Sequence, residues 1–192
     1  MRRAVVIGRA AGAMDDYCAA RALCTFDDVV VVGKMGEVFP DCIDHWVSFH
    51  VDLFDKWTAT RASRGLPAAR NFWGGEHKSA RRRAYDIITT GGPLKYVRCV
   101  GGSSGFMAVQ IALDELGAER VVLAGIPMRV EDSHFPGAAS EKEQGAPWSE
   151  ADAYWTTWEE NMAQLTGRVR SMSGRTRERL GYPDAGWLAG GL

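Results

Sequence analysis

The sequence predicts one α/β domain spanning residues 1–192, with a doubly wound, mostly parallel sheet and helices on both faces. Short apolar runs at residues 4–7 and 28–32 each end at a glycine, as strands buried on both faces of a parallel sheet do. A helical pattern over residues 14–24 separates these runs, so the chain opens with a β-α-β unit. Because 46% of the residues are hydrophobic, the chain can bury one substantial core.

The next elements are less regular. Residues 44–50 alternate in polarity and predict a third strand, and residues 52–64 predict a helix that ends at Gly65. The stretch over residues 70–94 is rich in glycine and in basic residues, and we expect it to be mostly loop.

The second half contains the clearest β-α-β unit of the chain. A strand over 96–100, a helix over 104–116 that is apolar nearly all round, and a strand over 120–124 predict a helix buried against the sheet. A polar stretch then runs to residue 147 and is long enough to be a lid or an active-site loop. The last expected elements are a helix over 149–165 that opens with a capping box, a strand over 168–173 and a short helix over 175–180.

Composition argues against several classes of partner. The net charge of −1 and a pI near 6.4 provide no cationic field for non-specific nucleic-acid binding. No apolar stretch approaches the roughly 20 residues that span a bilayer, so we expect a soluble, cytoplasmic protein without a membrane partner. The four cysteines have no metal-type spacing, and we expect buried thiols and no metal site. A catalytic thiol at Cys99 is the alternative, and the oligomeric state is left open.

A loop of small residues, Gly101-Gly102-Ser103-Ser104-Gly105, lies between a predicted strand and a predicted buried helix. Backbone N–H groups and the positive end of a helix can hold an anion at such a position. Glycines allow the main chain to approach a ligand closely, and serine hydroxyls add donors. The loop therefore predicts a site for the phosphates of a nucleotide, although a tight turn with a serine cap would need similar residues.

The loop after the first strand is a weaker candidate. Gly8-Arg9-Ala10-Ala11-Gly12 resembles a dinucleotide-binding loop but lacks the full glycine pattern. Gly33-Lys34 stands where an acidic residue would bind the ribose of NAD, which disfavours a nicotinamide dehydrogenase. Gly8, and Gly125 at the end of a later strand, are still expected to contact the ligand.

Three side chains are candidates for catalysis. His134 lies in the polar loop that follows residue 124, and Asp132 lies two residues before it, so the pair offers a base and an acid above the sheet. His50 ends the third predicted strand and could reach the same cleft. His45 begins that strand and is expected to face the opposite side from His50.

Other features leave two interpretations each. The basic run Arg81-Arg82-Arg83 could grip phosphate, or it could be a solvated face. Trp155 and Trp158 lie three residues apart on one helix face, where core packing is favoured over a stacking platform.

A family resemblance covers the loop and helix at residues 102–113, Leu116-Gly117, and the strand and turn at residues 121–128. These segments resemble the Rossmann-like superfamily of sialyltransferase-type glycosyltransferases and 6-hydroxymethylpterin diphosphokinase-like proteins, which includes uncharacterised phage-encoded members. The resemblance implies that the segments frame a nucleotide, and that the cytoplasm could be that of a phage-infected bacterial host. A histidine after this segment is the base in the sialyltransferase-type enzymes, and the resemblance gives that role to His134. Pro127 departs from the pattern, because relatives commonly have an aspartate there.

Together these features predict a nucleotide-binding transferase, glycosyltransferase-like, that uses a nucleotide or nucleotide-sugar donor. The absence of a D-x-D motif indicates no obligatory metal. Two alternatives remain: a non-catalytic nucleotide-binding or virion-associated module, and a pterin diphosphokinase-like enzyme, which would need Mg²⁺ with ATP.

Overall fold

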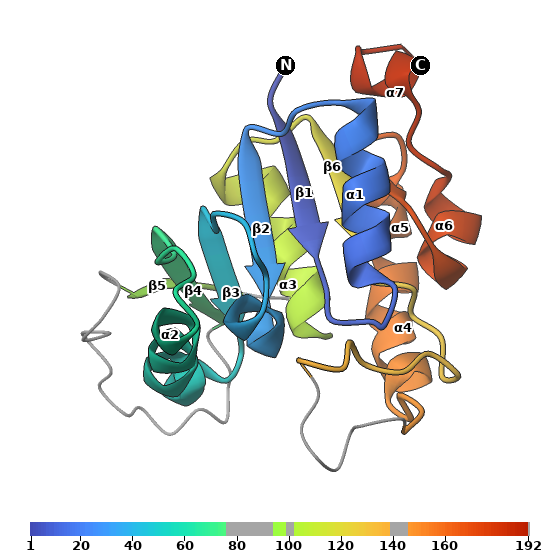
Figure 1. Ribbon diagram of the computed structural model, residues 1–192. Coiled ribbons are helices and arrows are strands. Elements are labelled where there is room, and N and C mark those ends of the chain that lie inside the picture. Colours follow the sequence, from blue (N-terminus) through green and yellow to red (C-terminus); the bar gives the residue numbers. More distant parts are fainter. Residues whose placement is uncertain (76–93, 99–101, 139–145, 192) are drawn as a thin grey trace.

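A computed structural model describes residues 1–75, 94–98, 102–138 and 146–191 (Figure 1). Within these residues, seven parallel strands form one sheet in the order β5-β4-β3-β2-β1-β6-β7. Helices cover both faces of the sheet, which confirms the predicted doubly wound, Rossmann-like α/β fold. The strands are β1 (Arg3–Ile7), β2 (Asp28–Val32), β3 (His45–Ser48), β4 (Asn71–Gly75), β5 (Leu94–Val97), β6 (Arg120–Ala124) and β7 (Val169–Ser171).

Two groups of helices enclose the sheet. Helices α1, α2 and α7 pack on one face, and α3, α4 and α5 pack on the other, while α6 follows the edge strand β7 (Figure 1). No helix in the described part of the chain is both long and apolar enough to cross a membrane. The helices are α1 (Ala13–Leu23), α2 (Phe54–Ser63), α3 (Ser104–Gln110), α4 (Ala151–Glu160), α5 (Met162–Leu165), α6 (Gly174–Leu180) and α7 (Ala185–Leu188), with short turns η1 (Gly33–Glu37), η2 (Val51–Leu53) and η3 (Ile111–Glu115).

The strand order reverses once. From β1 the chain adds β2 to β5 on one side of the sheet, and it then crosses back to add β6 and β7 on the other side. All the strands run in parallel, so the sheet has one edge of strand ends, here called the carboxyl edge, and an opposite amino edge. Ligands of doubly wound sheets bind outside the carboxyl edge, at the point of reversal. That point lies between β1 and β6.

The continuous apolar runs place side chains in two cores. Along β1, Val5 and Ile7 belong to the core under α1 and α2, while Ala4 and Val6 belong to the core under α3 and α4. This two-sided burial is why these strands lack the alternation of a half-exposed sheet. Trp155 and Trp158 of α4 lie in the α3-side core, as expected from their spacing.

Several details differ from the sequence-based expectations. The stretch expected to be loop contains β4, whose Phe72 and Trp73 are buried, and the strand expected over 96–100 is formed over Leu94–Val97. The helix expected over 149–165 is divided at Asn161 into α4 and α5. No side-chain cap forms at the start of α4, so the prediction of a capping box was wrong. The prediction that the cysteines are buried was also wrong. Cys18 lies on the outer face of α1 and Cys42 on a surface loop, and both are exposed.

The two ends of the described chain meet at the amino edge (Figure 1). The Met1 amino group lies 3.6 Å from the carboxylate of Glu119, which directly precedes β6. A Cβ atom on Gly190 would lie 2.6 Å from the Met1 side chain. Both ends therefore lie at the amino edge, opposite the carboxyl edge where ligands of such sheets bind.

Candidate functional site

The loops after β1, β5 and β6 converge at the carboxyl edge. A Cβ atom added to Gly8 would lie 2.5 Å from Ile126 Cγ1, and one added to Gly105 would lie 3.5 Å from Ile126 Cδ1. The loop after β3 joins them, because the Phe49 backbone N–H donates to Ser104 Oγ at 3.2 Å. Gly8 and Gly105, which are about a hundred positions apart in the sequence, thus both border the Ile126 side chain.

Both serines of the small-residue loop have bonds inside the protein. Ser103 Oγ caps α3 by accepting the Phe106 N–H, and Ser104 Oγ holds Phe49. Gly102 has a φ of +79°, and a Cβ atom there would lie 3.1 Å from Thr157, so its glycine is required by the turn itself. The structure places this loop at the first turn of α3, whose N–H groups have no partner within the helix. Gly101 lies outside the described residues, as do Cys99 and Arg81 to Arg83.

The loop after β1 is closed by a second segment, here called the strap, residues 129–138. Ala10 of the loop pairs with His134 of the strap as an isolated antiparallel bridge. On either side of that bridge, the Ala11 N–H donates to Ser133 O at 2.9 Å and the Phe135 N–H donates to Arg9 O at 2.6 Å. The strap therefore crosses the point where the strand order reverses.

Close packing explains the two glycines at the ends of β1 and β6. A Cβ atom on Gly8 would lie 2.3 Å from Gly125 O, and the Gly8 N–H donates to Ala124 O. Gly125 has a φ of +64°, and its N–H donates to Asp16 Oδ2 at 2.9 Å. Their main chains border the candidate site, but their N–H groups are bonded within the protein.

Met128, in the segment that follows β6, has a strained backbone conformation. Its φ is +56°, the only positive value at a non-glycine residue in the described chain, and its side chain is fully buried. A left-handed conformation costs a non-glycine residue of the order of 1 kcal/mol, and such residues cluster at functional sites. The strain lies directly before the strap.

Asp132 carries the most unusual polar atom of the strap. Its Oδ2 is buried and has no hydrogen-bond partner within the described residues. Burial raises the pKa of the Asp132 carboxyl, and the nearby charges of Glu131 and Asp16 add to the increase, against Arg129. His134, two residues on, has its ring 6.5 Å from that of Trp148 in an edge-to-face arrangement.

The other two histidines considered lie on opposite edges of the sheet. His50 is exposed at the carboxyl edge, where its N–H donates to Ser48 Oγ. His45 is buried at the amino edge, where Nε2 contacts Asp28 at 3.2 Å and Nδ1 accepts from Trp73 Nε1 at 3.0 Å. This Asp–His pair resembles a catalytic pair, but it is sealed in the core away from the strand reversal.

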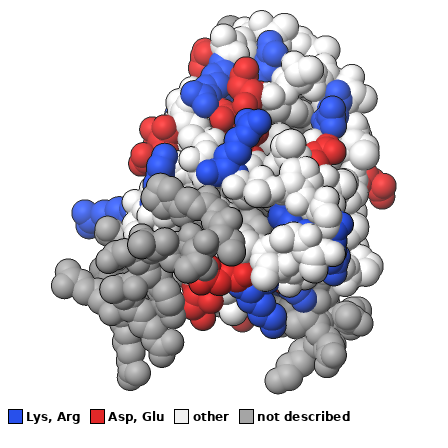
Figure 2. Space-filling view, turned by 60° about the vertical axis from the view of Figure 1, so that its left-hand side comes forward, with Lys and Arg blue, Asp and Glu red and all other residues white. Residues whose placement is uncertain are grey.

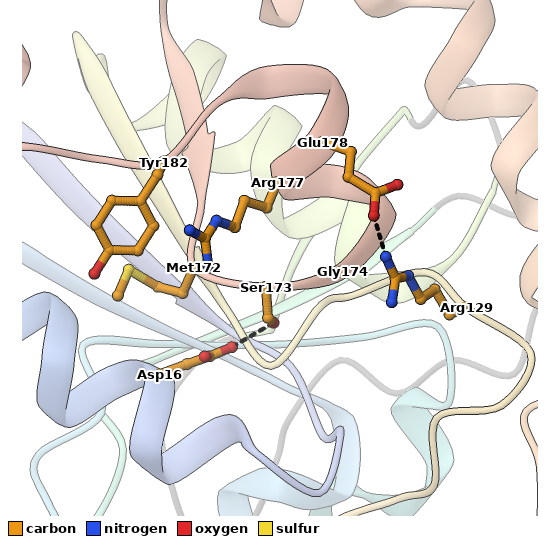
Figure 3. A pocket seen from close by; sticks show the side chains of 8 residues that line it. All are labelled: Asp16, Arg129, Met172, Ser173, Gly174, Arg177, Glu178 and Tyr182. Carbon is orange, nitrogen blue, oxygen red and sulfur yellow. Dashed lines mark hydrogen bonds and ion pairs between the residues drawn. The ribbon is translucent and has the colours of Figure 1, made fainter.

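A hollow beside β7 was not expected from the sequence. It measures about 620 Å³ and opens between α1 and α6 at the carboxyl ends of β6 and β7 (Figure 3). The sequence assigns Asp16 only to a helix start, although its position just after the β1 loop was a usable signal. The residues that line it are Asp16, Arg129, Met172, Ser173, Gly174, Arg177, Glu178 and Tyr182.

Charged side chains of the described residues also lie outside the hollow. On the face drawn in colour in Figure 2, basic and acidic side chains are interspersed, without a broad patch of one sign. The described part of the chain holds no group of three or more His, Cys, Asp or Glu side chains suited to a metal ion. Comparison with protein-family models, with curated proteins and with solved structures found no match for this sequence.

Proposed function

We propose that this protein is a nucleotide-binding transferase that holds a nucleotide-activated donor at the carboxyl edge and transfers a group to an acceptor hydroxyl. One observation carries the proposal: at the reversal between β1 and β6, the strap buries a carboxylate oxygen, Asp132 Oδ2, that has no partner in the described protein. Buried polar atoms are almost always hydrogen-bonded, so an unpaired one at a ligand-binding position suits a ligand that donates.

The first turn of α3 would hold the donor phosphates. Its N–H groups and helix dipole favour negative charge, and it lies beside the loops after β3 and β6. The same groups would stabilise the nucleotide as it leaves with additional negative charge.

His134 would act as the base. Neutral imidazole takes the proton of the acceptor hydroxyl, the acceptor oxygen bonds to the donor carbon, and the bond between that carbon and the phosphate oxygen breaks. The electron pair of that bond leaves with the nucleotide. Asp132 would accept a hydrogen bond from a hydroxyl of the bound substrates and so orient them.

Binding is tested by thermal-shift measurements with nucleotides, sugar nucleotides and pterins, because a ligand that binds only the folded state raises the apparent stability. We expect stabilisation by one nucleotide class. Backbone amide NMR should then show shifts at Gly102, Ser103 and Phe49, and not at Asp28 on the amino edge. If none of the compounds stabilises the protein, the proposal is wrong. Tight binding without any product would instead favour a non-catalytic module.

Two variants at one position separate charge from shape. Ser104→Asp places a negative charge where a phosphate would lie, and an acidic residue in a first helical turn does not harm the helix. Ser104→Asn has nearly the same shape without the charge. We expect Ser104→Asp to weaken nucleotide affinity at least about tenfold through like-charge repulsion, and Ser104→Asn to have a much smaller effect. Equal effects of the two variants would exclude a phosphate at this turn.

A further inference from the structure

The hollow beside β7 lies across a short segment from the proposed donor site. Residues 125–128 separate the two, because Ile126 faces Gly105 of α3 while Pro127 faces Gly174 of α6. The Gly174 contact is close: a Cβ atom there would lie 2.3 Å from Pro127 Cβ. One turn of chain thus borders both sites.

The charged side chains that line the hollow differ in their interaction partners. Arg129 is paired with the carboxylate of Glu178, and Asp16 Oδ2 accepts from Ser173 Oγ at 2.6 Å (Figure 3). Arg177 instead lies over the ring of Tyr182, with its guanidinium carbon 4.6 Å from the ring centre. Within the described residues, no carboxylate forms an ion pair with Arg177.

The shape of the hollow suits a small organic molecule. A volume of about 620 Å³ lies within the range of small-molecule sites. Met172 is buried and adds apolar surface to the lining of the hollow, while Tyr182 is 40% exposed. Arg177 adds a planar set of donors that matches the two oxygens of a carboxylate or phosphate.

We infer that this hollow is the acceptor site of the protein and that the acceptor is a small acidic molecule whose carboxylate or phosphate is held by Arg177. The assignment as an acceptor rests on the proposed function, whereas the binding of an acidic molecule does not. Asp16 and Arg129 line the hollow and also lie within electrostatic range of Asp132 on the strap. An acceptor anchored at Arg177 would therefore extend toward the side chain proposed to orient its hydroxyl.

Binding can be tested without knowing the natural acceptor. Benzoate and phenyl phosphate are suitable probes for the two anionic groups, and benzamide is a neutral molecule of the shape of benzoate. Each is titrated to about 10 mM, which detects weak millimolar binding, while backbone amide shifts are followed. We expect benzoate or phenyl phosphate to shift Met172, Ser173 and Tyr182 in a saturable way, and the preferred probe to identify the anion. Benzamide should bind at least about tenfold more weakly.

Arg177→Gln removes the proposed anion ligand, and Arg179→Gln makes the same change on the same helix outside the hollow. We expect Arg177→Gln to weaken the anionic probe at least about tenfold and Arg179→Gln to leave its affinity within about twofold. The inference is overturned if neither anion binds, if benzamide binds equally well, or if the two variants behave alike. Probe binding here together with failure of nucleotides at Ser104 would reject the proposed function and keep the anion site.

Discussion

Single residues of the strap combine structural and proposed chemical roles. The backbone of His134 pairs the strap with Ala10, whereas its half-buried ring lies edge-to-face against Trp148. Replacement of the ring therefore need not disturb the backbone bridge. The role of the His134 side chain can therefore be tested by substitution.

We expect His134→Ala to reduce turnover by about 10² to 10⁴-fold while donor affinity stays nearly unchanged, because a general base contributes in that range. The rate of the parent should rise with pH through the histidine pKa, since only neutral imidazole accepts the proton. Steady-state kinetics against pH measure both effects. His50→Ala, at the exposed histidine on the same edge, is the control, and a larger loss there would move the base to His50.

We expect the buried Asp132 carboxylate to lower the free energy of unfolding and to be necessary for turnover. Its raised pKa means that the folded state holds the ionised carboxyl less well than the unfolded state does. At neutral pH, Asp132→Asn should leave the free energy of unfolding unchanged or raise it by up to about 1 kcal/mol, while turnover falls. Denaturant unfolding and kinetics on the same variant test this.

The matched control for Asp132→Asn is Glu131→Gln at the neighbouring exposed carboxylate. It removes the same charge from the same turn and should retain turnover. Loss of stability in Asp132→Asn would show that Oδ2 has a structural partner, contrary to its place in the proposed site.

At the scale of elements, the short helix α7 depends on arginines from distant strands. Arg3 Nε of β1 donates to Leu188 O, and Arg120 Nε of β6 donates to Trp187 O. The Trp187 ring is 3% exposed, lies under the guanidinium groups of Arg120 and Arg170, and donates from Nε1 to Gly167 O. Cations are favourable at helix C-termini, and here they come from the sheet.

Trp187→Ala should therefore lower the free energy of unfolding by about 3–5 kcal/mol, the usual cost of removing a buried tryptophan. Urea denaturation measures this change. Tyr182→Ala, at a residue that is 40% exposed and a few positions away, should cost less than about 1 kcal/mol. If the two variants are equally stable, α7 is not anchored as described.

Elements with strong local patterns were predictable, and others were not. The strand over residues 120–124 was placed correctly because its apolar run is bounded on both sides. Strand β4 was missed because Gly74 and Gly75 read as loop residues, whereas here they allow side chains to approach: a Cβ atom on Gly75 would lie 2.3 Å from Phe49. Helix α7 has only four residues, and its packing comes from β1 and β6, which no local window contains.

At the scale of the whole molecule, the fold class followed from the alternation of strands and helices, but the site did so only in part. The sequence located the glycine-serine loop and the strap, since both follow strand ends. It could not locate the hollow, because Asp16, Arg129 and Arg177 come together only when β6 and β7 are placed beside β1. Long-range strand order of this kind is not visible in local periodicity.

Acid should destabilise the whole fold through the buried cluster at the amino edge. Burial lowers the pKa of His45 despite the opposite effect of Asp28, and the Trp73 N–H occupies Nδ1, so the imidazole is neutral. Burial opposes ionisation of Asp28, but its bonds to Arg2 and His45 hold its pKa below the usual value. The unfolded chain thus binds more protons than the folded one below about pH 6.5, and stability falls as the pH decreases.

The free energy of unfolding, measured by urea denaturation at several pH values, should decrease from neutral pH downward. Trp73→Phe frees Nδ1 to accept a proton and should reduce this pH dependence, although it lowers stability at neutral pH. An unchanged slope in Trp73→Phe would show that His45 is not the titrating group.

The meeting of the two chain ends at the amino edge has a practical consequence for engineering. Met1 and Gly190 are close enough that a short linker could join them, and the exposed turn at Gly65 could supply new ends. Such a circular permutant would keep every strand neighbour of the sheet. For the same reason, an affinity tag or a surface tether at either end of the described chain would project away from the strap, and the molecule could be immobilised with its carboxyl edge facing the solution.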